Sequence, residues 1–238
     1  MLADTLTRRV AKPIVFALCL LPLLWLLAGI AGWAGADLGA NPVEKTQDTL
    51  GIWGLRLLLA TLAITPLREI GGWPRLQLFR RMLGLFAFAY LLLHFLFYLF
   101  VDQALDWRQL VADIIKRPYI TVGFAALLLL APLALTSTRR AMRRMGRRWQ
   151  ALHRLIYPAA VLGCVHFWWQ VKADVREPLI YVAVASLLLG WRVVGWWRRR
   201  QARAAASAAR VSRPRTDRDA GQNQDAAGTG SPVHGFPE

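Results

Sequence analysis

Two histidines lie inside long apolar stretches of the chain, where an ionisable side chain is costly to bury. They are His94 and His166, and no cluster of cysteines and carboxylates with zinc-ligand spacing lies near them. Two imidazoles on neighbouring helices can bind one metal ion from opposite sides. For either residue alone, a plain hydrogen bond to a neighbouring helix is the alternative.

The composition excludes an ordinary soluble domain. Of 238 residues, 56% are hydrophobic, and the mean hydropathy is +0.35. A net charge of +16 would suit a nucleic-acid-binding protein, but the apolar residues come in blocks of about 20, the length of a membrane-spanning helix. The two cysteines lie in different apolar blocks, which excludes a disulfide framework.

Six apolar segments predict an all-α, multi-pass membrane protein, a six-helix bundle over residues 13–197. The segments are Pro13–Ala36, Thr49–Leu67, Met82–Val101, Pro118–Thr138, Leu155–Val171 and Pro178–Val194. Residues 1–12 form a short N-terminal segment. Residues 198–238, rich in Ala, Arg, Gly and Pro, are expected to form a disordered tail. The first segment could instead be a signal peptide, although its apolar run is long for one.

The loops between these segments alternate in charge. The basic ones are residues 8–12, 68–81, 139–148 and 198–203, and the loops between them are acidic or balanced. Positive loops stay in the cytoplasm, so both termini are expected there. The basic loop over 139–148 can simply determine topology and contact anionic lipids, or it can bind a flavin phosphate or a flavoprotein.

This orientation places the two buried histidines at matched depth. His94 is seven residues before Val101, and His166 is five residues before Val171. Both therefore lie about 7–11 Å below the outer boundary. Haem is the flat cofactor that two such imidazoles would hold, and two axial histidines favour electron transfer over oxygen chemistry.

Other polar residues in or beside the spans allow more than one interpretation. His153 lies about 20 Å deeper than His166, towards the cytoplasm. A second haem there would need a partner near Arg80 and Arg81, so we expect one haem, with these residues near an inner-side flavin, quinone or other cofactor. An interfacial histidine is the alternative for His153. Arg56 could pair with a haem propionate or extend to the outer surface.

Several motifs carry a family resemblance. They are Leu38–Val43, Leu59–Thr61, Ile64–Leu67, Arg80–Leu85, Arg117–Thr121, Thr136–Thr138, Gly146–His153 and Pro178–Tyr181. Together, over about residues 10–195, they resemble the MsrQ (YedZ) family. Its members are haem-binding membrane subunits of the bacterial protein-methionine-sulfoxide reductase system, within a ferric-reductase-like transmembrane group.

The resemblance implies b-type haem held by His94 and His166, with His153 matching a third family histidine. It implies electron transfer from the quinone pool or a soluble flavin reductase across the inner membrane. The acceptor would be a periplasmic molybdopterin subunit that reduces methionine sulfoxide in oxidised proteins, and FMN is associated with the family. The larger group carries two haems on two histidine pairs, and Arg80 and Arg81 depart from that pattern.

We expect no substrate-reducing active site in this chain. About 40 residues follow the spans, too few for a nucleotide-binding domain, and outer loops of roughly 15 residues are too short for a molybdenum site. The electron donor would then be a lipid-soluble carrier or another protein. Two alternatives stay open: a ferric reductase-type cytochrome, and a small proton-coupled transporter without haem.

Overall fold

The computed structural model describes residues 7–33, 35–171 and 174–211, and every regular element within them is a helix. The all-α prediction is therefore confirmed for this part of the chain. The elements are η1 (Thr7–Ala11), α2 (Lys12–Ile30), α3 (Pro42–Gly71), η2 (Pro74–Leu76), α4 (Gln77–Phe97), η3 (Tyr98–Asp102), α5 (Trp107–Lys116), α6 (Pro118–Leu135), α7 (Arg139–Met145), α8 (Arg147–Leu152), η4 (His153–Leu155), α9 (Ile156–Gln170) and α10 (Arg176–Val211).

Five helical stretches of the described chain are long and apolar enough to cross a membrane, so this is an integral membrane protein. They are Arg9–Ile30, Pro42–Gly71, Pro74–Asp102, Pro118–Leu135 and Arg176–Ala208. The sequence predicts one additional span, the fifth in chain order, over Leu155–Val171. There the structure forms α9, which has 15 residues and is shorter than the other five.

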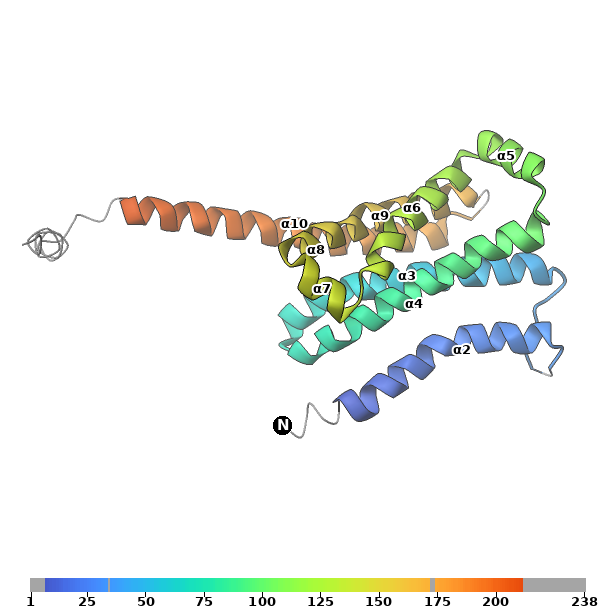
Figure 1. Cartoon of the computed structure of the whole chain (residues 1–238), viewed down its shortest axis with the longest axis horizontal. Helices are drawn as coiled ribbons and strands as arrows, with labels where there is room; N and C mark the ends of the chain where they lie inside the picture. Colours follow the sequence, from blue (N-terminus) through green and yellow to red (C-terminus); the bar gives the residue numbers. More distant parts are fainter. Residues whose placement is uncertain (1–6, 34, 172–173, 212–238) are drawn as a thin grey trace, which may run out of the picture. The chain divides into compact units, whose positions relative to one another are not determined.

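Helix α3 is the central helix of the bundle. In its most apolar 18-residue segment 56% of the residues are buried, against 22% or less in the matching segments of the other four stretches. Leu58 and Leu62 are almost fully buried, and α3 packs along α4 and against α2 and α9 (Figure 1). Asn41 begins the helix, because its side chain accepts a hydrogen bond from the Glu44 backbone N–H at 3.3 Å. Gly72, with φ +64°, ends it.

A tyrosine of α4 interrupts the backbone hydrogen bonds of α2. The Tyr90 hydroxyl donates to the Cys19 carbonyl at 2.8 Å and accepts from the Leu23 N–H at 3.1 Å. These two backbone groups are four residues apart and would pair with each other in a regular helix. Pro22 lies between them and already removes one N–H from this turn. Tyr90, 1% exposed, thus joins α2 to α4 where α2 is weakest.

The exposed face of helix α5 is apolar, and a carboxylate lies on its buried face. Trp107, Val111 and Ile115, four residues apart and so on one face, are 66%, 55% and 76% exposed. Asp113 is 8% exposed and lies 3.6 Å from Arg117, and the Tyr98 hydroxyl donates to it at 3.4 Å. Because α5 joins two membrane-spanning stretches, this pattern is typical of a helix lying in the membrane–water interface.

Several boundaries differ from those that hydropathy predicts. Helix α3 begins at Pro42, seven residues before the predicted span, because its first two turns are polar but well capped. Helix α10 continues as a helix to Val211, where the sequence predicts a disordered tail from residue 198. Alanine and arginine, which dominate this stretch, have high helix propensity. The rest of the predicted tail, residues 212–238, lies outside the described residues, as do residues 1–6 of the N-terminal segment.

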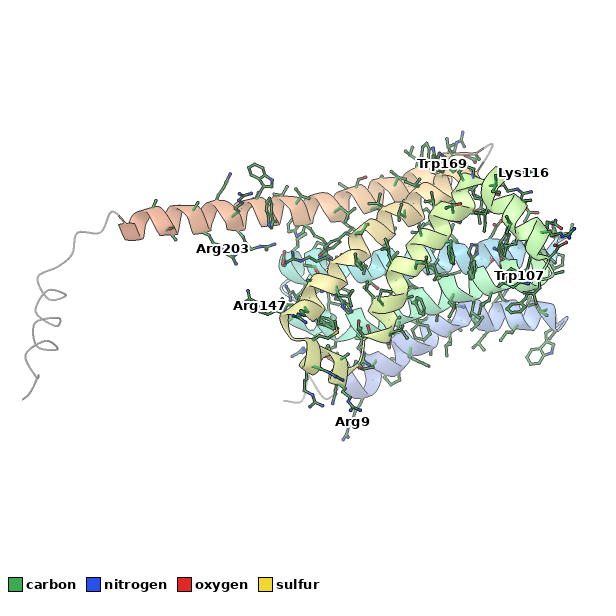
Figure 2. All side chains as sticks on the ribbon, turned by 45° about the horizontal axis from the view of Figure 1, so that its top comes forward. Arg9, Trp107, Lys116, Arg147, Trp169 and Arg203 are labelled. Atoms are coloured by element: carbon green, nitrogen blue, oxygen red, sulfur yellow. The ribbon has the colours of Figure 1, made fainter. Side chains whose placement is uncertain are left out.

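The chain divides into two compact units, residues 1–191 and 192–238. The first holds the bundle. The described part of the second is the Ala- and Arg-rich end of α10. Within the first unit, Trp107, Lys116 and Trp169 lie at one end of the bundle, and Arg9 and Arg147 lie at the other (Figure 2). We call these the aromatic end and the basic end. The separation follows the loop charges of the sequence.

Candidate cofactor site

A cavity of about 1600 Å³ opens between the helices of the first unit. Its walls come from α2, α3, α4, α6 and α9, and the start of α10 contributes Glu177. Three of the residues predicted to form a site line it: His94, His166 and Arg56. The cavity therefore brings together three of the six residues that the sequence predicts for a site.

The two imidazoles face each other across this cavity. Their ring centres are 6.2 Å apart and their planes are inclined by 80°. His94 lies near the end of α4 and His166 near the end of α9. Each is anchored to the first part of another helix: His94 Nδ1 bonds the Gln47 carbonyl of α3 at 2.9 Å, and His166 Nδ1 bonds the Tyr119 carbonyl of α6 at 2.7 Å.

These two anchors determine the tautomer of both rings. A carbonyl oxygen can only accept a hydrogen bond, so Nδ1 must carry the proton and donate it. The other ring nitrogen, Nε2, is then left with a free lone pair, which is the form of histidine that binds a metal ion. Both rings are thus held in the protonation state that a metal ligand requires.

Two glycines bring the helix backbones against the histidine rings. A Cβ atom added to Gly123 would stand 2.7 Å from His166 Nδ1 and 2.8 Å from its Cε1. A Cβ atom on Gly51 would stand 3.0 Å from both Cε1 and Nδ1 of His94. Small residues at helix contacts allow such close approach inside membranes. At these two positions any larger residue would press on an imidazole.

Arg56 stands at the wall of the same cavity, 14 residues after the start of α3. Its Nε donates to the Tyr181 hydroxyl at 2.7 Å, and its Nη2 lies 3.8 Å from the Glu177 carboxylate. The guanidinium carbon is 5.1 Å from the centre of the Trp53 ring. The arginine is therefore held by α10 on one side and by an aromatic ring of its own helix on the other.

His153 does not line this cavity, and neither do Arg80 and Arg81. The His153 ring stacks on Trp149, with ring centres 3.8 Å apart, and its Nδ1 bonds the Trp149 carbonyl at 3.1 Å. Its Nε2 is buried and has no partner at full hydrogen-bonding geometry among the described residues, although the Leu133 backbone also contacts the ring. Burial lowers the pKa of His153, and the nearby positive charge of Arg80 lowers it further. Arg81 is exposed.

Sequence reasoning missed the residues that position the site. The carbonyls of Gln47 and Tyr119 orient the rings, and Tyr181 holds Arg56. Backbone carbonyls leave no mark in a sequence, because every residue has one. Glycines inside apolar helices, at positions 51 and 123, were the available signal of close packing.

Comparison with known proteins assigns the family. A family model described as "Ferric reductase like transmembrane component" matches residues 50–164. The haem-binding subunit MsrQ of the protein-methionine-sulfoxide reductase of Rhodospirillum rubrum is 54% identical over 200 residues, which are 84% of this chain and 95% of that protein. The same subunit of Bordetella pertussis is 51% identical over 196 residues, covering 80% and 92%. That of Xanthomonas campestris is 50% identical over 213 residues, covering 87% and 95%.

The chain belongs to the MsrQ family. The resemblance that the motifs indicate is thus confirmed. The ferric-reductase-like match includes His94 and His153 and ends at Cys164, two residues before His166. Within the described residues no group of three or more histidines, cysteines or carboxylates could hold a metal ion. In this MsrQ-family chain, the imidazoles of His94 and His166 come together at the cavity.

Proposed function

We propose that this chain is a membrane b-type cytochrome subunit. It passes electrons from the quinone pool, or from a soluble flavin reductase, to a periplasmic molybdopterin-containing methionine-sulfoxide reductase that repairs oxidised proteins. Its relatives are named haem-binding subunits of that system. One observation carries the assignment of the site: His94 and His166 face each other at 6.2 Å with both Nε2 atoms free.

The residues in the cavity fit a haem. Metal–imidazole bonds are about 2 Å long, so two imidazoles on opposite sides of one metal ion have ring centres about 6 Å apart. The observed separation of 6.2 Å agrees with this. The cavity also has room for a large cofactor, because its volume of about 1600 Å³ exceeds the range of about 300–1,000 Å³ usual for ligand pockets.

Each residue has a distinct task in this proposal. His94 and His166 would hold the haem iron, and the Gln47 and Tyr119 carbonyls fix the orientation of the two imidazoles. Arg56 offers a positive charge for a haem propionate. When bound, haem would supply a one-electron couple. The chain itself then needs no substrate-reducing active site.

The topology we propose has six crossings over residues 13–197, in the bacterial inner membrane, with both termini in the cytoplasm. Helix α9 would be the fifth crossing. Its last turn meets the first turn of α6 through His166 and Tyr119, so the two run antiparallel. At about 22 Å it is shorter than the bilayer core of about 30 Å, a mismatch that local thinning accommodates. The basic end would face the cytoplasm.

The electron donor would act at the basic end. Arg80, whose charge acts on His153, and the exposed Arg81 are the candidate residues there, for a quinol, for FMN or for a flavoprotein. Guanidinium groups form charge-assisted contacts with phosphates and planar anions. His153, held neutral and stacked on Trp149, would contribute its buried Nε2 atom to that region.

The test of this proposal uses the detergent-purified full chain, reduced anaerobically with limiting dithionite. The reduced haem absorbance should persist until the purified periplasmic reductase and methionine sulfoxide are added together, and should then decay to the oxidised spectrum. Decay with a ferric chelate but not with the reductase would favour the ferric-reductase alternative. A colourless protein from haem-replete cells would contradict the cytochrome proposal and favour the transporter.

A further inference from the structure

The start of α10 forms a clamp around Arg56, defined here as Tyr181 and Glu177. Tyr181 accepts a hydrogen bond of 2.7 Å from Arg56 Nε, and Glu177 lies 3.8 Å from Arg56 Nη2. These residues are one helical turn apart on α10 and so present one face to the arginine. Without them Arg56, whose side chain is 41% exposed, would keep its contact with Trp53 but could turn its guanidinium towards solvent.

The tyrosine of the clamp is itself fixed by the helix that carries a candidate haem ligand. Its ring meets the ring of Phe167 edge to face, with ring centres 5.6 Å apart. Phe167 directly follows His166 on α9. Tyr181 therefore connects α9, α10 and α3 at the level of the cavity. The position of the Arg56 charge depends on α10 and not on α3 alone.

We propose that Tyr181 and Glu177 are positioning residues that set the reduction potential of the haem through the charge of Arg56. This inference rests on the proposed function, because it places haem between His94 and His166. Tyr181 holds the positive charge at the cavity wall, which favours the electron-rich reduced state. Glu177 neutralises part of that charge and lines the cavity too, so it competes with an acidic edge of the cofactor for Arg56.

The two clamp residues therefore have opposite effects. Replacing Glu177 by glutamine removes a negative charge and should raise the potential. Replacing Tyr181 by phenylalanine keeps the ring but releases the guanidinium, and should lower the potential, as Arg56→Gln should. Because Arg56 is partly exposed, solvent screens each effect. We expect a three- to tenfold change in the ratio of reduced to oxidised haem, which is about 28–59 mV for a one-electron couple.

The experiment is a spectroscopic redox titration of the full chain in lipid nanodiscs, with haem content measured separately. Trp191→Phe is the matched control, because Trp191 Nε1 also links α10 to α3, by donating a hydrogen bond to the Glu69 carboxylate at 3.1 Å. This control should keep the wild-type potential. In the Arg56→Gln background, Tyr181→Phe should have no further effect, because it acts only through the arginine.

The outcomes separate this inference from the proposed function. Opposite shifts for Glu177→Gln and Tyr181→Phe, with the second lost in the Arg56→Gln background, would support the clamp. Haem bound at wild-type content but with unchanged potentials, or Tyr181→Phe and Arg56→Gln effects that add, would overturn the clamp alone. A wild-type chain without haem would overturn the proposed function and the clamp with it.

Discussion

The contact between Gly123 and His166 gives the sharpest quantitative prediction. A methyl group at position 123 would stand 2.7 Å from His166 Nδ1 and within 3.0 Å of two further ring atoms. Carbon atoms and neighbouring heavy atoms settle at about 3.5 Å, so the ring must move by roughly 0.7 Å or more. Metal–ligand distances tolerate only about 0.2 Å. The Gly123→Ala substitution should therefore displace a ligand out of bonding range.

The expected loss is about 10- to 100-fold in haem affinity, as found for residues that orient metal ligands. The assay is titration of the haem-depleted protein with haem, followed by the Soret absorbance. Gly51→Ala should lose less, because its Cβ would stand 3.0 Å from His94. Gly190→Ala is the matched control, since nothing lies within 4 Å of its added Cβ.

A general loss of folding would not explain such a result. Alanine is more favourable than glycine within a helix by about 1 kcal/mol, so propensity alone stabilises all three variants. Circular dichroism at equal protein concentration checks this. The reasoning would be refuted if Gly123→Ala bound haem like Gly190→Ala, because the close contact with residue 123 would then not determine the position of the His166 ring.

Three further predictions concern the surrounding fold. Tyr90→Phe should cost about 1–3 kcal/mol of unfolding free energy, measured by thermal melting, because two backbone groups of α2 lose their bridging hydroxyl. The lowered pKa of His153 means that the folded state favours neutral imidazole, so its stability falls as pH drops below about 6.5. His153→Gln should lose less stability than wild type between pH 7.5 and 5.5, and an equal loss would contradict this. An environment-sensitive fluorophore on Ile115→Cys should show more apolar emission in nanodiscs than one on Gln109→Cys, because Ile115 lies on the apolar face of α5. Both native cysteines are buried, so the introduced cysteine takes the label.

Hydropathy and the placement of charged residues located five of the six predicted spans, because both depend on composition along the chain. They could not predict where helices end once composition stops being apolar. Helix α3 begins seven residues early on a side-chain cap, and α10 runs on to Val211 on alanine and arginine. The 15 residues of α9 were predicted as a span by their lack of charge, which says nothing about length.

The sequence indicated three of the residues that line the cavity, but not the groups that hold their side chains in place. His94, His166 and Arg56 stand out because ionisable groups in apolar helices are costly. The equal depth of the two histidines followed from the 1.5 Å rise per residue. Their anchors depend on how each helix is rotated against its neighbour. The Gln47 and Tyr119 carbonyls, and the hydroxyl of Tyr181, therefore emerged only from the packed structure.

The central claim is that His94 and His166 hold one haem between them. The most direct measurement is the reduced-minus-oxidised visible spectrum of the purified chain, with pyridine haemochrome quantification, for the wild type and its His94→Ala, His166→Ala and His153→Ala variants. We predict about one b-type haem per wild-type chain, retained in His153→Ala and lost in the other two. Full Soret absorbance in His94→Ala or His166→Ala would contradict the assignment of the axial ligands.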